Sequence, residues 1–169
     1  MFINDGIPTQ EELDKVTPSS ERLAQGPVAI VECFQEIPCN PCVKACKQGA
    51  ITMPGDINGL PALDAELCNG CGVCISFCPG LAIFIVDKTW SEERALVKIP
   101  FEYVPIPQAG QYAAGLDRAG REVGWFEVVK VTSGGRKNMT RTISLAVPQD
   151  LAMEVRNIQV GGYMDGKQR

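Results

Sequence analysis

The 169-residue chain has no histidine, and its eight cysteines are confined to residues 33–78. The N-terminus has neither a basic start nor an apolar core, so we expect no signal peptide. No apolar run approaches the length of a membrane span, and together these two absences predict a cytoplasmic protein. Residues 91–169 lack a glycine-rich phosphate loop and paired catalytic groups, so we expect no catalytic site there.

Net charge is small and unevenly distributed along the chain, with a formal total of −4. Residues 1–26 hold two basic and five acidic side chains, residues 27–90 hold three and six, and residues 91–169 hold eleven and nine. The acidic N-terminal half argues against a nucleic-acid partner. An apolar content of 45% is ordinary for a globular protein.

The cysteines form two runs with closely related spacing. The first run reads C-x5-C-x2-C-x3-C from Cys33, and the second reads C-x2-C-x2-C-x3-C-P from Cys68 to Pro79. The candidate metal ligands are therefore Cys33, Cys39, Cys42, Cys46, Cys68, Cys71, Cys74 and Cys78.

Three chemistries could explain eight such cysteines. Disulfides suit small secreted domains, but the absence of a signal peptide argues against that compartment. Zinc could use two four-cysteine sites, although its ligands typically come as separated C-x2-C pairs. An iron–sulfur cluster is favoured because the second run has the bacterial C-x2-C-x2-C-x3-C-P spacing, including the closing proline.

Residues 27–87 resemble the bacterial-type ferredoxin that carries two [4Fe–4S] clusters. The flanking text "ACKQGAIT" and "FCPGLAIF" is similar to the internal repeat of that family, a cysteine loop followed by a short helix and a strand. Two features depart from the pattern: "FQEIP" lengthens the first gap, and Lys47 stands where a proline usually follows the fourth cysteine. We expect the Lys47 charge to favour the reduced form of its cluster.

The resemblance implies that the fourth cysteine of each run serves the other run's cluster. One [4Fe–4S] cluster would take Cys33, Cys39, Cys42 and Cys78, and the other would take Cys68, Cys71, Cys74 and Cys46. In the second loop we expect Gly70 and Gly72 to supply left-handed backbone conformations, which Asn69 also tolerates.

The predicted fold class is α+β, a dicluster ferredoxin domain followed by a small antiparallel β-barrel-like domain. Alternating patterns predict strands over residues 95–106, 122–132 and 141–148, with turns at 117–120 and 133–138 and a short helix from Pro148 to about Asn157. The predicted segments are 1–26, a helical docking segment; 27–90, the ferredoxin domain; 91–160, the β-domain with its terminal helix; and 161–169, a C-terminal tail.

Clusters whose iron sites are all filled by thiolates pass single electrons and offer no open coordination position. Two flanks that make up more than half of the chain favour an iron–sulfur subunit of a larger oxidoreductase over a free, diffusible ferredoxin. A weaker resemblance covers "GIPTQEELDKV", "ERLAQGPVAIVECFQEIPCNPC" and "YAAGLDRAGREVGWFEVVKV". It is to the small ferredoxin-like proteins found with multi-subunit, FAD-dependent amino-acid and amine dehydrogenases. It implies a flavoprotein subunit and other subunits as partners. A zinc-bound scaffold stays as a remote alternative.

Overall fold

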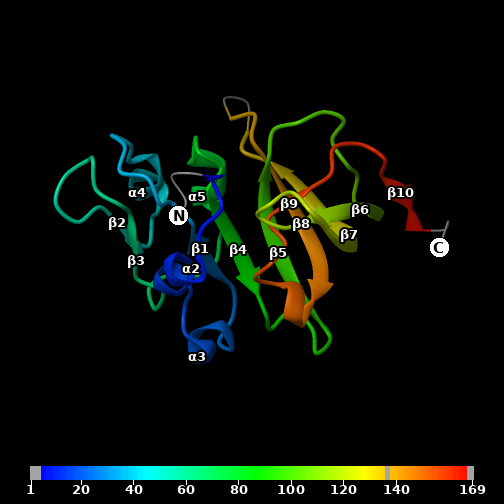
Figure 1. Cartoon of the computed structure of the whole chain (residues 1–169), viewed down its shortest axis with the longest axis horizontal. Coiled ribbons are helices and arrows are strands. Elements are labelled where there is room, and N and C mark those ends of the chain that lie inside the picture. The colour runs from blue at the N-terminus through cyan, green and yellow to red at the C-terminus, as the bar shows by residue number, and fades with distance from the viewer. Residues whose placement is uncertain (1–4, 136–137, 167–169) are drawn as a thin grey trace.

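The computed structural model describes residues 5–135 and 138–166, and Figure 1 shows the whole chain. Parts of three predicted segments lie outside the described residues. They are residues 1–4 of the helical docking segment, 136–137 of the second turn and 167–169 of the tail. The short helices and the small β2–β3 hairpin gather at one end of the molecule, and the large sheet occupies the other (Figure 1).

One eight-stranded antiparallel sheet organises the chain. Its path runs β1 (Val28–Val31), β4 (Ile83–Asp87), β5 (Arg94–Phe101), β8 (Arg141–Pro148), β7 (Glu122–Ser133), β6 (Gln111–Leu116) and β10 (Met164–Asp165), with β9 (Asn157–Ile158) also paired to β6. A separate two-stranded sheet joins β2 (Ile51–Thr52) and β3 (Ala62–Leu63).

The expected barrel-like closure is wrong. Within the described residues the sheet is open, since its path ends at β1 on one side and at β10 on the other. The sheet also crosses the predicted boundary at residue 90, because β4 pairs directly with β5 through Val86 and Val97. The cysteine-bearing segment and the C-terminal strands therefore share one hydrogen-bonded ladder, and the segment limits proposed above stay a prediction.

Strands β1 and β4 are buried on both faces, which explains their continuous apolar sequences. Because side chains alternate along a strand, one set of residues faces the cysteines and the other faces the main core. The cysteine-facing set is Ala29, Val31, Ile83 and Ile85. The opposite set, Val28, Ile30, Phe84 and Val86, packs in the main core with residues from the later strands.

The N-terminal segment forms two short helices, α2 (Gln10–Val16) and α3 (Ser20–Leu23). The sequence Thr9-x-x-Glu12 makes the expected capping box, in which each side chain accepts a hydrogen bond from the other residue's backbone N–H. Helix α2 buries none of its residues, whereas α3 buries Arg22 and Leu23. The segment is therefore anchored through α3.

Three further expectations for the C-terminal half need correction. The first strand ends at Phe101, and the sequence after it carries an unpredicted strand, β6, which is rich in alanine and glycine. The expected helix after Pro148 is only a 3-10 turn, Gln149–Leu151. After that turn the Arg156 backbone N–H donates to the Leu116 carbonyl. The chain then continues into strand β9, which pairs with β6. Strands β7 and β8 agree with the sequence prediction.

A buried ion-pair cluster connects the start of the first cysteine run to the C-terminal strands. The Glu32 carboxylate accepts hydrogen bonds from Arg118 Nε at 2.9 Å and Nη2 at 2.7 Å, and from Arg156 Nε at 2.7 Å. The Glu32 and Arg156 side chains are only 7% and 4% exposed. Burial opposes ionisation of Glu32, but the two guanidinium groups outweigh it and lower the pKa of that carboxyl.

We expect Glu32→Ala to lower the free energy of unfolding by about 3–5 kcal/mol, because it leaves the buried Arg156 without its carboxylate partner and removes the closer partner of the half-buried Arg118. Glu127→Ala is the matched control. It breaks the exposed Arg94–Glu127 pair and should cost at most about 1 kcal/mol. Anaerobic urea denaturation followed by circular dichroism measures both. Equal losses in the two variants would contradict a joining role for Glu32.

Candidate metal centres

Two five-residue helices position the cysteines. Helix α4 (Pro41–Ala45) carries Cys42, and helix α5 (Val73–Phe77) carries Cys74. Each helix is followed at once by the last cysteine of its run, Cys46 or Cys78, in an extended conformation. This break turns the fourth cysteine of each run away from the preceding three.

The first cavity is lined by Cys33, Cys39, Cys42 and Cys78. Three of these thiols come from the first run and one from the end of the second. The remaining lining is largely apolar and includes Val31, Ile37, Pro41, Pro79 and Ile83.

The second cavity is lined by Cys46, Cys68, Cys71 and Cys74. Here three thiols come from the second run, and Cys46 closes the first. Ala29, Ile51 and Ile85 are among the apolar residues around them. The structure therefore brings together the two crossed sets that the ferredoxin resemblance implies.

The donor chemistry of both cavities fits a group with several iron atoms. All eight thiols are free, and they surround each cavity from several sides. Within residues 5–135 and 138–166 no group of three or more His, Cys, Asp or Glu side chains is arranged to hold a single metal ion.

Burial and repulsion by neighbouring thiolates raise the pKa of three of these thiols, Cys33, Cys42 and Cys74. Burial is the main cause that raises the pKa of Cys33 and Cys42, and the charges of Cys78 and Cys39 add to it.

The second set behaves in the same way. Burial raises the pKa of Cys74 to about 12, with further contributions from Cys68, Cys71 and Cys46. In each set the repelling thiolates include the cysteine from the other run, Cys78 in the first set and Cys46 in the second. A cationic metal group would remove this repulsion by binding the thiolates.

Backbone amides support one sulfur in each set. The Ala29 N–H donates to Cys68 Sγ and the Ala82 N–H donates to Cys78 Sγ, both at 3.4 Å. Such hydrogen bonds stabilise negative charge on ligand sulfurs.

The second loop has the backbone shape expected of it. Gly70 and Gly72 adopt φ of 65° and 82°. A Cβ on Gly70 would lie 2.4 Å from Pro27 Cβ, so the loop also needs glycine for close packing. Asn69 is not left-handed; its side chain instead accepts a hydrogen bond from the Cys71 N–H at 3.2 Å.

Two cations beside the second loop were not identified from the sequence. Arg22 of α3 donates to the Cys68 carbonyl at 2.6 Å, and Lys98 of β5 donates to the Gly70 carbonyl at 3.2 Å. Neither lies near the cysteines in sequence, and an isolated Arg or Lys has no pattern that marks it. Lys47, which does adjoin a cysteine, is exposed, so solvent screens its charge.

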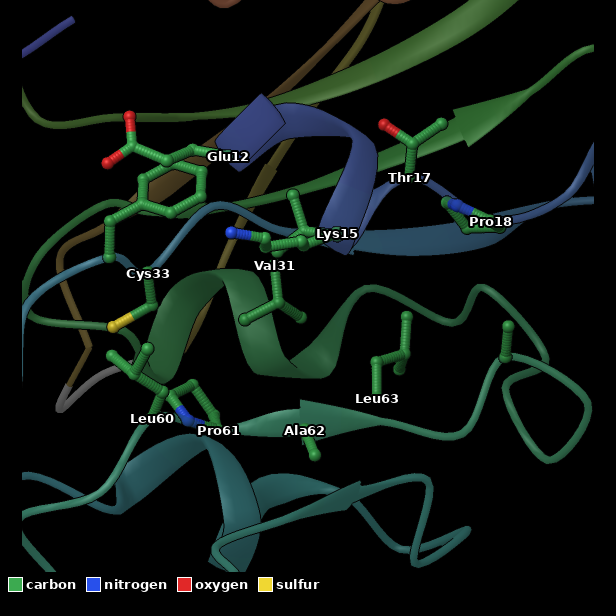
Figure 2. A pocket seen from close by; sticks show the side chains of 13 residues that line it. Glu12, Lys15, Thr17, Pro18, Val31, Cys33, Leu60, Pro61, Ala62 and Leu63 are labelled. Atoms are coloured by element: carbon green, nitrogen blue, oxygen red, sulfur yellow. The ribbon is translucent and has the colours of Figure 1, made fainter. Parts of the chain in front are cut away.

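A cleft of about 570 Å³ adjoins the first set on the side of α2. Figure 2 shows Glu12 and Lys15 of α2 above it, Ala62 and Leu63 of β3 below it, and Cys33 at one end. The helix thus bridges over the cleft without filling it. A protein surface or a small molecule in this cleft would approach one thiol of the first set.

Comparison with known proteins agrees with the cysteine geometry. Residues 37–87 match the 4Fe-4S dicluster domain family. This part of the chain is therefore an iron–sulfur ferredoxin domain, and the protein carries two [4Fe–4S] clusters. Cys33 precedes the matched range, yet it lines the first cavity together with Cys39, Cys42 and Cys78, which the range includes.

The chain is also similar to ferredoxin-type protein NapF from Escherichia coli K12 and from the O6:H1 and O157:H7 strains. In each case the identity is 38% over 52 residues, which is 30% of this chain and 32% of the relative. The match thus spans about a third of these curated relatives. No solved structure matches the chain. Among the described residues no helix is both long and apolar enough to span a membrane.

We expect Cys46→Ser to damage the cluster of the second set and Cys78→Ser to damage that of the first, because each side chain lines the cavity of the other run. Electron paramagnetic resonance of the reduced variants, with iron analysis, measures which signal is lost. If Cys78→Ser, rather than Cys46→Ser, removed the signal of the cluster bound by Cys68, Cys71 and Cys74, the crossed assignment of the fourth cysteines would be wrong.

Gly70→Ala should deplete the second cluster, since the added Cβ would overlap Pro27 and strain a left-handed residue. Gly80→Ala is the control, because a Cβ there meets nothing within 4 Å. Iron and sulfide analysis should give about eight of each per wild-type and control chain, and markedly less for Gly70→Ala. Full occupancy in Gly70→Ala would show that the loop can shift.

Proposed function

We propose that the chain transfers single electrons through two [4Fe–4S] clusters. In this proposal Cys33, Cys39, Cys42 and Cys78 hold the first cluster, and Cys68, Cys71, Cys74 and Cys46 hold the second. The observation that carries it is the convergence of two four-thiol sets on two neighbouring cavities. When bound, each cluster accepts or releases one electron without an open coordination site.

The protein's own residues insulate and connect the two redox positions. Ala29, Ile75 and Ile85 are fully buried in the small core that both cysteine sets contact. An apolar, rigid spacer keeps water out and holds the two sets at a constant separation. The crossed cysteines tie both sets to the same core.

We propose further that the chain works as a fixed subunit beside a flavoprotein, in an FAD-dependent amino-acid or amine dehydrogenase. A flavin takes two electrons from a C–N bond, and two one-electron clusters can pass them on one at a time. The N-terminal segment supports a docking role, because α2 buries none of its residues and borders the open cleft beside Cys33.

Exposed apolar side chains near the first set also suit a partner surface. Ile37, Ile57 and Leu60 are 47%, 46% and 40% exposed. Ile37 lines the first cavity, the Ile57 carbonyl accepts a hydrogen bond from the Cys39 N–H, and Leu60 borders the cleft. Apolar groups around a redox site favour a stable interface over a brief encounter.

The second candidate function is that of a free ferredoxin. The curated relatives are named ferredoxin-type proteins, and Cys71 of the second set is exposed to solvent. An exposed ligand is what a diffusible carrier needs for brief contacts with several enzymes.

Deleting residues 1–18 distinguishes between these two functions. The deletion removes helix α2 but retains Arg22, which donates to the Cys68 carbonyl. We expect the C-terminally tagged full-length protein to co-purify anaerobically with an FAD-containing chain. The truncated protein should lose that chain and retain both clusters.

Protein-bound flavin absorbance, partner mass and iron content are measured on both forms. Equal iron in the two forms is the control for intact metal centres. A full-length protein that runs as a monomer in native lysate and reduces several unrelated enzymes would overturn the subunit proposal while leaving electron transfer intact.

A further inference from the structure

The two flanks of the ferredoxin domain place cations on the same cysteine loop. Arg22 comes from the N-terminal flank and Lys98 from the C-terminal strands, and both donate to backbone carbonyls between Cys68 and Cys71. The second set therefore has positive charge on two sides, and both charges come from outside the two cysteine runs.

Arg22 is held rigidly, since its residue is only 6% exposed. Its guanidinium donates to the carbonyls of Ala65 at 2.7 Å, Gly26 at 3.2 Å, Pro27 at 3.1 Å and Cys68 at 2.6 Å. All four acceptors are neutral carbonyls. Within the described part of the chain no salt bridge neutralises Arg22.

Lys98 of β5 is half-buried and lies opposite Ile85 of the neighbouring strand β4. Its stem passes Gly72, where an added Cβ would lie 3.9 Å from Lys98 Cδ. Its ammonium then reaches the Gly70 carbonyl at 3.2 Å. Like Arg22, it takes part in no salt bridge within the described residues.

The charges beside the first set compensate one another instead. Glu32 immediately precedes Cys33, and its carboxylate is ion-paired with Arg118 and Arg156. The exposed Glu154 lies 3.9 Å from Arg118 and offsets the second positive charge. Within the described residues the first set thus lacks the unpaired, poorly solvated cations that lie beside the second set.

We propose that Arg22 and Lys98 hold the reduction potential of the second cluster above that of the first. Reduction adds one negative charge, and an uncompensated cation in a poorly solvated place stabilises that charge more than a paired or exposed one. The inference rests on the proposed cysteine assignment. When the chain holds one electron, that electron leaves the first cluster and resides on the second, with no bond made and no proton moved.

This arrangement gives the flanks a role besides docking. The segment around Arg22 and the strand around Lys98 bias electron flow from the first set, beside the cleft, toward the second set, which includes the exposed Cys71. A ferredoxin core alone would lack both cations.

Anaerobic redox titration of the full-length holoprotein, followed by electron paramagnetic resonance, tests the proposal in Lys98→Gln, Arg22→Gln and the double variant. At the wild-type midpoint of the higher couple, we expect the reduced-to-oxidised ratio to fall about tenfold in the double variant, which is a shift of about 59 mV for one electron. The lower couple should move little. The Cys71→Ser variant identifies which signal belongs to the second set.

Lys130→Gln and Lys47→Gln are the matched controls, since both remove an exposed lysine charge, and neither should move the higher couple as Lys98→Gln does. Arg22→Lys should restore much of the Arg22→Gln shift if charge is the cause. Should Arg22→Gln fail to fold, the reduction potential of the Lys98→Gln variant tests the proposal by itself. An unchanged higher couple in Lys98→Gln, or a shift confined to the lower couple, would overturn the proposal. A wild-type protein that binds too little iron for two clusters would instead contradict the assignment of the cysteines as cluster ligands.

Discussion

Gathering eight thiols around two adjacent cavities is the constraint on which the rest of the structure depends. Burial above all, with repulsion from neighbouring thiolates, raises the pKa of Cys74 to about 12, so a cationic group is needed to hold this side chain as a thiolate. The crossing of Cys46 and Cys78 makes both sets share one small core. Both sets therefore pack against the same buried apolar side chains.

The sheet carries this constraint into the rest of the chain. Strands β1 and β4 pack one face on the cysteine sets and the other on the main core, so they cannot move independently of either. Glu32 adds an electrostatic connection, because its buried carboxylate holds Arg118 and Arg156 from the C-terminal half. Such a pair is costly to break, since either partner alone would be a buried, uncompensated charge.

Arg22 changes how the N-terminal segment is understood. The sequence indicates two marginal helices suited to docking, and α2 fits that expectation in having no buried residue. The next helix does not, because Arg22 is buried and donates to four carbonyls around the second cysteine loop. One flank thus combines a helix without buried residues, α2, with a helix, α3, that contacts the second cysteine loop.

By itself the sequence determined the local chemistry: the cysteine spacing, the left-handed glycines at 70 and 72, the capping box at Thr9, and strands β7 and β8. Each depends on residues a few positions apart, so a short pattern suffices. Only the tertiary structure decided which distant groups meet. The pairing of β4 with β5, the strand β6 of small residues, the open sheet, and the placement of Arg22 and Lys98 on one loop all join segments far apart in sequence. Their partners are chosen by packing and burial over the whole chain, which no local pattern records.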